Sequence, residues 1–148
     1  MMRRVVSVLL ALVAAPALAE DIVRVPATGN VGEVMDRLET AVMEAGAKVF
    51  ARVDHGAGAA SVDMPISASE LLVFGNPALG TPAMQADPLA GLFLPLKVLA
   101  YEDADGAVWL AYEDPAATFG DLEIPEDAEV LTKMSGALGK LTAAAAGG

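Results

Sequence analysis

The sequence contains no cysteine and only one histidine among its 148 residues. The lack of cysteine excludes disulfide bonds and a lipid anchor on a cysteine, so the core alone must hold the chain together. Basic residues are also scarce, because 20 aspartates and glutamates outnumber 9 lysines and arginines and give a formal charge of −11. That sign is wrong for a protein that neutralises phosphates, and we expect no nucleic-acid partner. No complete catalytic motif is present, so the sequence names no reaction.

The composition is that of one ordinary globular domain. Apolar residues make up 55% of the chain and charged residues 20%, which is too apolar for an intrinsically disordered protein. A chain of this size buries roughly two thirds of the surface that it exposes when unfolded. It can therefore be stable without disulfide bonds.

The first 19 residues have the pattern of a secretory leader. Arg3 and Arg4 form the positive start, the apolar stretch from Val5 to Ala15 follows, and Ala17-Leu18-Ala19 is a small-x-small cleavage site. The apolar stretch is too short for a membrane span, which needs about 20 residues. We therefore predict a mature chain that begins at Glu20, is periplasmic or secreted, and has no membrane association after cleavage.

Hydrophobic patterns in the mature chain predict strands and helices in a definite order. A capping box, Asn30 with Glu33, begins one helix, and Gly46 ends it. The predicted strands are 22–26, 49–53, 70–74, 94–101 and 108–112, and the predicted helices are 31–45, 80–85 and 126–141. This order favours a single α+β domain over residues 20–122, with a mainly antiparallel sheet packed against helices. Residues 123–148 are expected to form an extra C-terminal helix with a frayed tail from Ala143 onward.

Two strand features carry more detailed expectations. Asp105-Gly106 is a strong hairpin signal, and as a two-residue turn it would place Tyr101 opposite Leu110 and Leu99 opposite Tyr112. The stretch from Leu71 to Phe74 is continuously apolar. It predicts a strand that is buried on both faces or central in the sheet.

Four sequence blocks lie in the order and spacing of a known family. They are Phe50-Ala51-Arg52-Val53-Asp54-His55, the stretch Leu72-Val73-Phe74-Gly75-Asn76-Pro77 that continues through Gln85, Leu94-Pro95-Leu96-Lys97-Val98-Leu99, and Asp105-Gly106-Ala107-Val108-Trp109 with Tyr112. From Val49 to Phe119 the chain resembles the family called domain of unknown function 302. The resemblance implies a compact α+β domain that pairs as a homodimer, and it implies no activity. Phe93 departs from the family pattern, because such proteins tend to carry an aspartate there.

The candidate site residues follow two predicted strands. Asp54 and His55 end one strand and Asn76 ends the next. If those strands are neighbours, these side chains and the following Thr81, Met84 and Gln85 would converge on a pocket at one end of the sheet. The small residues from Gly56 to Ala60 would let a ligand approach the backbone. The structural alternatives are a strand-capping role for His55 and a turn-stabilising role for Asn76.

Three functions fit these residues. The leading hypothesis is an exported, non-enzymatic domain that binds a small ligand or a protein partner. The second is an enzyme with His55 as its general base, because histidine titrates near neutral pH. The third is periplasmic copper handling, in which Met64 and Met84 would join His55, since thioethers suit Cu(I).

We predict no other metal site and no cofactor. The acidic stretch from Glu102 to Asp105 fails as an EF-hand loop, because tyrosines occupy its first and last ligand positions. The apolar run around Leu92-Phe93-Leu94 is expected to enter the core or a subunit contact. Together with the family resemblance, this run predicts a homodimer.

Overall fold

The structure is a computed structural model that describes residues 21–147. The predicted leader and the predicted mature start at Glu20 lie outside the described residues. Within those residues, no helix is both long enough and apolar enough to cross a membrane.

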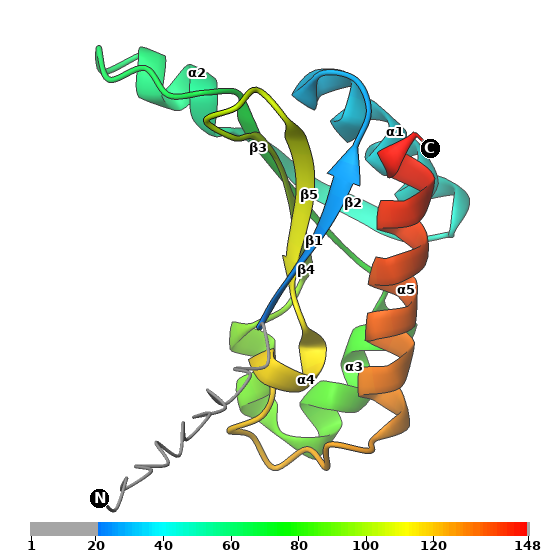
Figure 1. Cartoon of the computed structure of the whole chain (residues 1–148). Helices are drawn as coiled ribbons and strands as arrows, with labels where there is room; N and C mark the ends of the chain where they lie inside the picture. The colour runs from blue at the N-terminus through cyan, green and yellow to red at the C-terminus, as the bar shows by residue number, and fades with distance from the viewer. Residues whose placement is uncertain (1–20, 148) are drawn as a thin grey trace, which may run out of the picture.

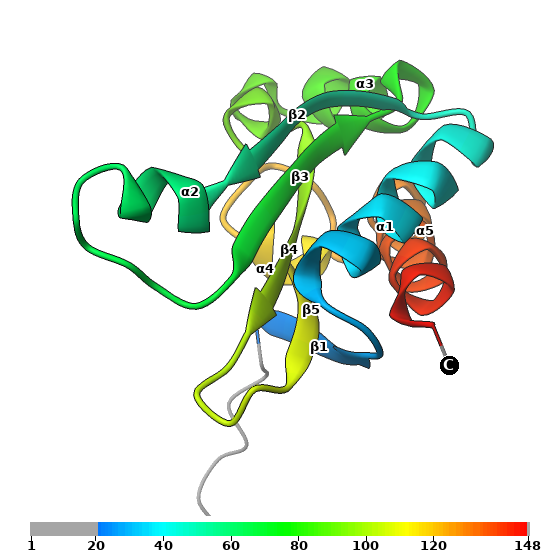
Figure 2. The same ribbon diagram turned by 90° about the horizontal axis from the view of Figure 1, so that it is seen from above.

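Five strands form one antiparallel sheet, and two long helices pack on one of its faces (Figures 1 and 2). The strand order is β1-β5-β4-β3-β2, and every neighbouring pair is antiparallel. The strands are β1 (Ile22–Ala27), β2 (Lys48–Asp54), β3 (Ser69–Gly75), β4 (Leu96–Glu102) and β5 (Val108–Glu113). The long helices are α1 (Val31–Glu44) and α5 (Glu129–Ala146). The predicted α+β domain with an extra C-terminal helix is confirmed.

The start of α1 follows from its sequence alone. The Glu33 amide donates to Asn30 Oδ1 at 3.0 Å, and the Asn30 amide donates to Glu33 Oε2 at 3.0 Å. These two bonds form the predicted capping box. After the helix, Gly46 has a φ of 78°, the left-handed conformation that glycine adopts without strain.

The main core lies between the sheet and the two long helices. Val34, Met35 and Leu38 of α1 are fully buried against Leu72 and Phe74 of β3. Because side chains alternate along a strand, Leu71 and Val73 lie on the opposite face of the sheet. β3 is an interior strand, as predicted, but no described helix covers its second face (Figure 2).

Short helices lie beyond the ends of the strands. They are α2 (His55–Ala60), α3 (Pro77–Ala86), the 3-10 helix η1 (Pro88–Leu92) and α4 (Pro115–Thr118). Phe119, Ile124 and Met134 form a second buried cluster beside α3 and η1. Asp87 joins these parts, because its carboxylate accepts hydrogen bonds from the amides of Leu89 and Glu123.

The predicted hairpin is present, but its register is shifted by one residue. Tyr101 pairs with Trp109 rather than Leu110, and Leu99 pairs with Ala111 rather than Tyr112. The reason is a five-residue loop from Asp103 to Ala107, closed by a bond from the Asp103 amide to the Ala107 carbonyl at 2.8 Å. A one-residue shift moves a side chain to the other face of the sheet.

The predicted fraying after Ala143 is wrong for the described residues. Helix α5 continues to Ala146, and Ala145 is fully buried. Arg37 Nε donates to the Ala145 carbonyl at 2.8 Å, and the Thr28 amide donates to the Ala146 carbonyl at 2.8 Å. These partners satisfy helix-terminal carbonyls that would otherwise need water.

Candidate functional site

One of two described depressions lies between β2, α3 and the chain that leads into β4. We call it the α3 groove, and its volume is about 270 Å³. Its wall is mainly apolar and contains Phe50, Gly75, Asn76, Pro77, Leu79, Gly80, Thr81, Met84, Gly91, Leu94, Pro95, Leu96 and Met134. A concave, mostly apolar surface with few polar groups is the usual form of a small-molecule site.

Three glycines keep the α3 groove open. A Cβ on Gly91 would lie 3.5 Å from Met84 Sδ, and one on Gly80 would lie 3.4 Å from Leu94 Cδ1. At Gly75 a Cβ would meet the side chains of Phe50 and Pro95, both at 3.5 Å. Side chains at these positions would occupy the space that the groove now offers to a ligand.

Phe50 forms one rim of the groove because the β2–β3 pairing shifts register between Val49 and Ala51. A bulge re-aims the side chains around it. The Phe50 ring is 53% exposed, and Lys48 Nζ lies 5.5 Å from its centroid. The alternation used to predict this strand gave no sign of the bulge, so the sequence did not identify Phe50 as a site residue.

The polar candidates in the groove have structural partners or face solvent. Asn76 Oδ1 accepts from the Ala78 amide at 2.9 Å and caps α3, and Pro77 occupies the first helical turn. Asn76 therefore has a structural role, which was the alternative to ligand binding for this residue. Thr81 and Met84 line the groove and are exposed, whereas Gln85 is exposed on α3 and does not line it.

Asp54 and His55 lie at the opposite end of the sheet, so the predicted convergence is wrong. Asp54 pairs with Glu70 at the start of β3, while Lys48 pairs with Gly75 next to Asn76. Because β2 and β3 are antiparallel, the ends of two consecutive strands are separated by a strand length, about 20 Å for six residues.

His55 begins helix α2 and is exposed. The Asp54 carboxylate accepts from the Ala57 amide at 2.8 Å, so it caps α2. Met64 follows α2 at this end of the sheet, while Met84 lies in the α3 groove at the other. The three ligands of the copper hypothesis are therefore not brought together.

The second depression lies at one end of the sheet face that the long helices leave open. Its volume is about 220 Å³, and its wall includes Ile22, Leu71, Phe93, Lys97, Leu99, Ala111, Tyr112, Glu113 and Phe119. Phe93 packs edge-on against Phe119, with ring centroids 6.0 Å apart. In this chain Phe93 is therefore a packing residue. Burial, with a smaller contribution from the charge of Asp114, raises the pKa of Tyr112.

A cluster of charges joins α1 to the edge of the sheet. Arg52 Nε donates to Glu70 Oε2 at 2.6 Å, and Arg52 Nη1 donates to Asp36 at 2.6 Å and to Glu39 at 3.3 Å. The hydrogen bond to Glu70 is the largest cause of a raised Arg52 pKa. Its partners come from α1 and β3, so the cluster is a structural joint.

These features define a single-domain α+β protein with one covered and one open sheet face. The family model described as "Domain of unknown function DUF302" matches residues 23–141, and the chain belongs to this family. A similar solved structure is the crystal structure of an uncharacterized conserved protein DUF302 from Bacillus stearothermophilus. It has a TM-score of 0.78 and 19% identity, and the match covers 86% of this chain and 99% of that one. At that identity the likeness shows the fold alone.

Curated relatives carry the name of an ion channel. Proteins named fluoride-specific ion channel FluC 1, from Brucella suis biovar 1 (strain 1330) and Brucella abortus biovar 1 (strain 9-941), are 39% identical over 128 residues. The match covers 85% of this chain but 50% and 47% of those proteins. The chain therefore spans about half the length of the curated relatives it matches.

Proposed function

We propose that this chain is an exported, non-enzymatic domain that binds a small apolar molecule in the α3 groove. The supporting observation is the apolar wall of about 270 Å³, kept open by Gly75, Gly80 and Gly91. Export rests on the leader pattern of residues 1–19. A protein partner for this domain is the second candidate.

The groove also supports a ligand of a particular chemistry. Phe50, Met84 and Leu94 present aromatic, thioether and aliphatic surface, which favours an apolar molecule. A formal charge of −11 disfavours anions at long range. The volume is slightly below the usual range of roughly 300–1,000 Å³ for small-molecule sites, so the ligand is small.

Geometry gives the enzyme hypothesis less support. A general base needs a substrate within hydrogen-bond reach and a group that orients it. His55 lines neither of the two described depressions, and the Asp54 carboxylate is engaged by the Ala57 amide.

The test fills the groove and measures binding of a neutral apolar dye, N-phenyl-1-naphthylamine. Gly91→Leu directs a side chain toward Met84, and we expect it to weaken dye binding at least tenfold. Gly136→Leu is the matched control, because a Cβ at this exposed α5 position has no neighbour within 4 Å. We expect the control to bind the dye like the unaltered protein.

Equal dye binding by all three proteins would contradict the proposal. Native mass spectrometry of the protein from its exporting host adds a direct measurement, with an expected small ligand that Gly91→Leu loses. The same measurement on His55→Ala separates the hypotheses, since the α3 groove lies at the other end of the sheet. Loss of the ligand from His55→Ala alone would move the site to α2.

The curated relatives favour a second candidate, association with a membrane channel. Their printed name is that of a fluoride channel, and they contain about as much additional chain as the part matched here. Fluoride itself is a poor ligand for an acidic chain with apolar depressions. The test is co-expression with a tagged fluoride-channel subunit, in which co-elution from detergent supports the association and elution apart contradicts it.

A further inference from the structure

Residues 55–68, which we call the arm, project from the edge of the sheet. The arm consists of α2 and the connection to β3, and no residue of α2 is buried (Figures 1 and 2). Three large apolar side chains after α2, those of Val62, Met64 and Ile66, are exposed. Exposed apolar surface of this kind is unfavourable in water, and no other described residue of the chain covers it.

The open sheet face carries a matching apolar surface. The strand registers place Val53, Leu71, Leu99 and Ala111 in one row across β2, β3, β4 and β5. The next row contains Tyr101 beside Trp109. An antiparallel sheet that faces water normally has polar side chains on that face, so this pattern is typical of a covered face.

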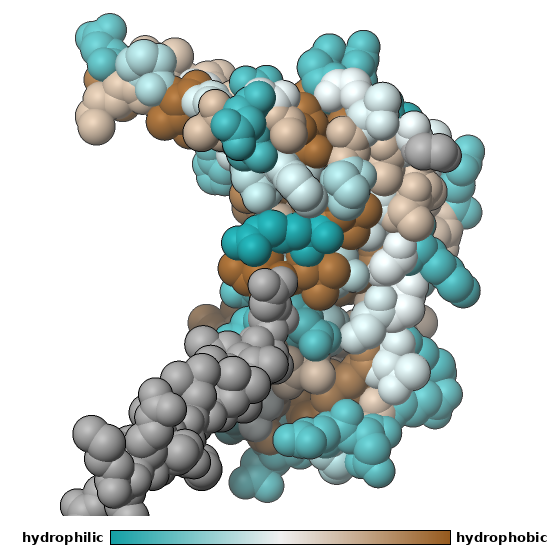
Figure 3. Space-filling view, in the orientation of Figure 1, coloured by the Kyte–Doolittle hydropathy of each residue, from teal (hydrophilic) through white to brown (hydrophobic). Residues whose placement is uncertain are grey.

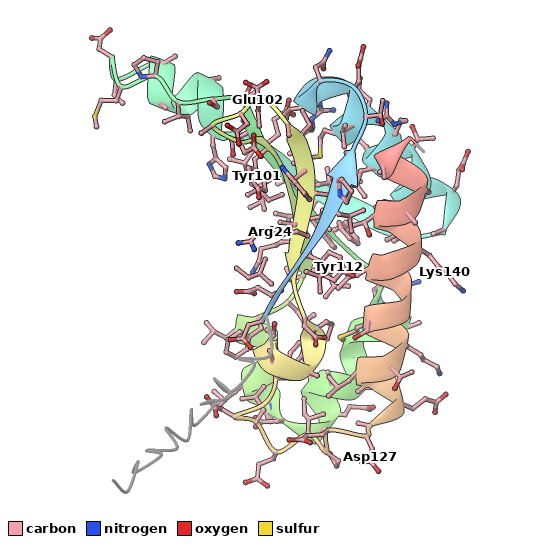
Figure 4. All side chains as sticks on the ribbon, in the orientation of Figure 1. Arg24, Tyr101, Glu102, Tyr112, Asp127 and Lys140 are labelled. Atoms are coloured by element: carbon pink, nitrogen blue, oxygen red, sulfur yellow. The ribbon has the colours of Figure 1, made fainter. Side chains whose placement is uncertain are left out.

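The arm and the open face lie on the same side of the molecule. Figure 3 shows that this side is hollowed below the arm, with hydrophobic side chains beside hydrophilic ones. Figure 4 shows Arg24 and Tyr101 pointing toward the open side and Tyr112 pointing toward α5. A second copy related by a two-fold axis can lay its arm on this face while receiving the first arm on its own.

The charges of the arm and the open face are compatible with contact between two copies. The arm contains Asp63 and neither lysine nor arginine, while the open face contains Arg24 and Lys97 together with Glu113 and the Asp103 carboxylate, which accepts from Trp109. Within the described residues, Arg24 makes no ion pair. Contact between two copies therefore brings Asp63 of one arm to a face on which Arg24 has no acidic partner among the described residues.

The arm is also needed for a dimer interface of standard area. Five strands about 4.8 Å apart and roughly 20 Å long give a projected face of roughly 450 Å². A standard interface buries about 800 Å² on each partner. The face alone falls short of that area, and an arm of 14 residues adds surface to both partners.

We propose that the chain forms a two-fold dimer in which the arm of each copy packs on the open sheet face of the other. The surface is distinct from the Leu92-Phe93-Leu94 run that first indicated a dimer. In the fold that run is divided, because Leu92 is exposed, Phe93 packs against Phe119 and Leu94 lines the α3 groove.

The test is light scattering of the chain without its leader at about 50 μM, with variants of the arm and the face. We expect a dimer for the unaltered protein and a monomer for Ile66→Asp and for Leu99→Asp. Met43→Asp is the matched control, because Met43 is 58% exposed on α1 and Ile66 is 56% exposed on the arm. We expect Met43→Asp to remain a dimer.

Trp109 provides a second measurement that does not depend on a variant. It is the only tryptophan, and it lies on the open face. Dilution of the dimer should therefore shift its fluorescence to longer wavelength as water reaches the ring. A monomer at 50 μM, a dimer that survives both Ile66→Asp and Leu99→Asp, or an emission independent of concentration would overturn the proposal.

Discussion

At the scale of single residues, Asp103 sets the register of the β4–β5 hairpin. Its Oδ1 accepts from the amides of Asp105 and Ala107, both at 2.9 Å, and its Oδ2 accepts from Trp109 Nε1 at 2.8 Å. The bond from Trp109, followed by that from Ala107, lowers the pKa of Asp103. One carboxylate therefore holds the loop and a side chain of the next strand together.

The Asp103 carboxylate predicts a pH dependence. Because folding lowers its pKa, its contribution to stability is present above the unfolded pKa of about 3.9 and is lost as the pH falls through the folded pKa. We expect the indole N–H proton resonance of Trp109 to titrate with a midpoint below about pH 3.9. Asp103→Asn should remove this transition, whereas a midpoint at or above the ordinary aspartate value would contradict the prediction.

Arg52 is a second residue on which several elements depend. Arg52→Met leaves Asp36, Glu39 and Glu70 close together without their cation. Charged hydrogen bonds contribute about 1.5–3 kcal/mol each when protected, but Arg52 is partly exposed to solvent. We expect a loss of about 1–2 kcal/mol in the free energy of unfolding, measured by urea denaturation.

The control for Arg52→Met is Lys133→Met. Lys133 pairs with Glu129 at 2.8 Å on the exposed surface of α5. An exposed pair of this spacing contributes about 0.3–0.5 kcal/mol. Equal losses from the two variants would show that the Arg52 cluster is no more than a surface ion pair.

At the scale of elements, the end of α5 is fixed by residues from the other end of the chain. The helix has no basic residue in its last turn, and Arg37 of α1 supplies the cation near its terminal carbonyls. A positive charge at this position also offsets the negative end of the helix dipole. The last turn is therefore part of the tertiary structure.

Removal of residues 143–148 tests the role of this last turn. The truncation deletes the buried Ala145 and the carbonyls that accept from Arg37 and Thr28. We expect it to lower the free energy of unfolding by about 2–4 kcal/mol, measured by urea denaturation. Lys140→Ala, an exposed substitution on the same helix, should change it by less than about 0.5 kcal/mol. An unchanged stability after truncation would mean that the segment frays in solution.

At the scale of the whole molecule, the predicted leader would determine where the chain acts. Cleavage after Ala19 would leave 129 residues of the 148 and, with Arg3 and Arg4 removed, would change the formal charge from −11 to −13. We predict that N-terminal sequencing of the exported protein begins at Glu20. Full-length protein with Met1 in the cytoplasmic fraction and none in the exported fraction would contradict this.

The sequence by itself determined the features that depend on nearby residues. The capping box of Asn30 and Glu33 is closed by residues three positions apart, and Gly46 ends α1 through its own backbone freedom. Alternation in some strands and a continuous apolar run in β3 were enough to predict five strands, and their order with α1 and α5 was enough to predict an α+β fold. The four sequence blocks also identified the family, which the match over residues 23–141 confirms.

Only the tertiary structure decided which distant residues meet. Antiparallel pairing of β2 and β3 separates His55 from Asn76, and the β2 bulge brings Phe50 to the rim of the α3 groove. Helix α5 remains helical to its last turn through a hydrogen bond from Arg37, which lies 108 residues before Ala145 in the sequence. Local patterns report hydrogen bonds and solvent exposure within a segment, whereas strand direction, bulges and helix ends are selected by the free energy of packing between segments. The groove and the open sheet face are products of that packing.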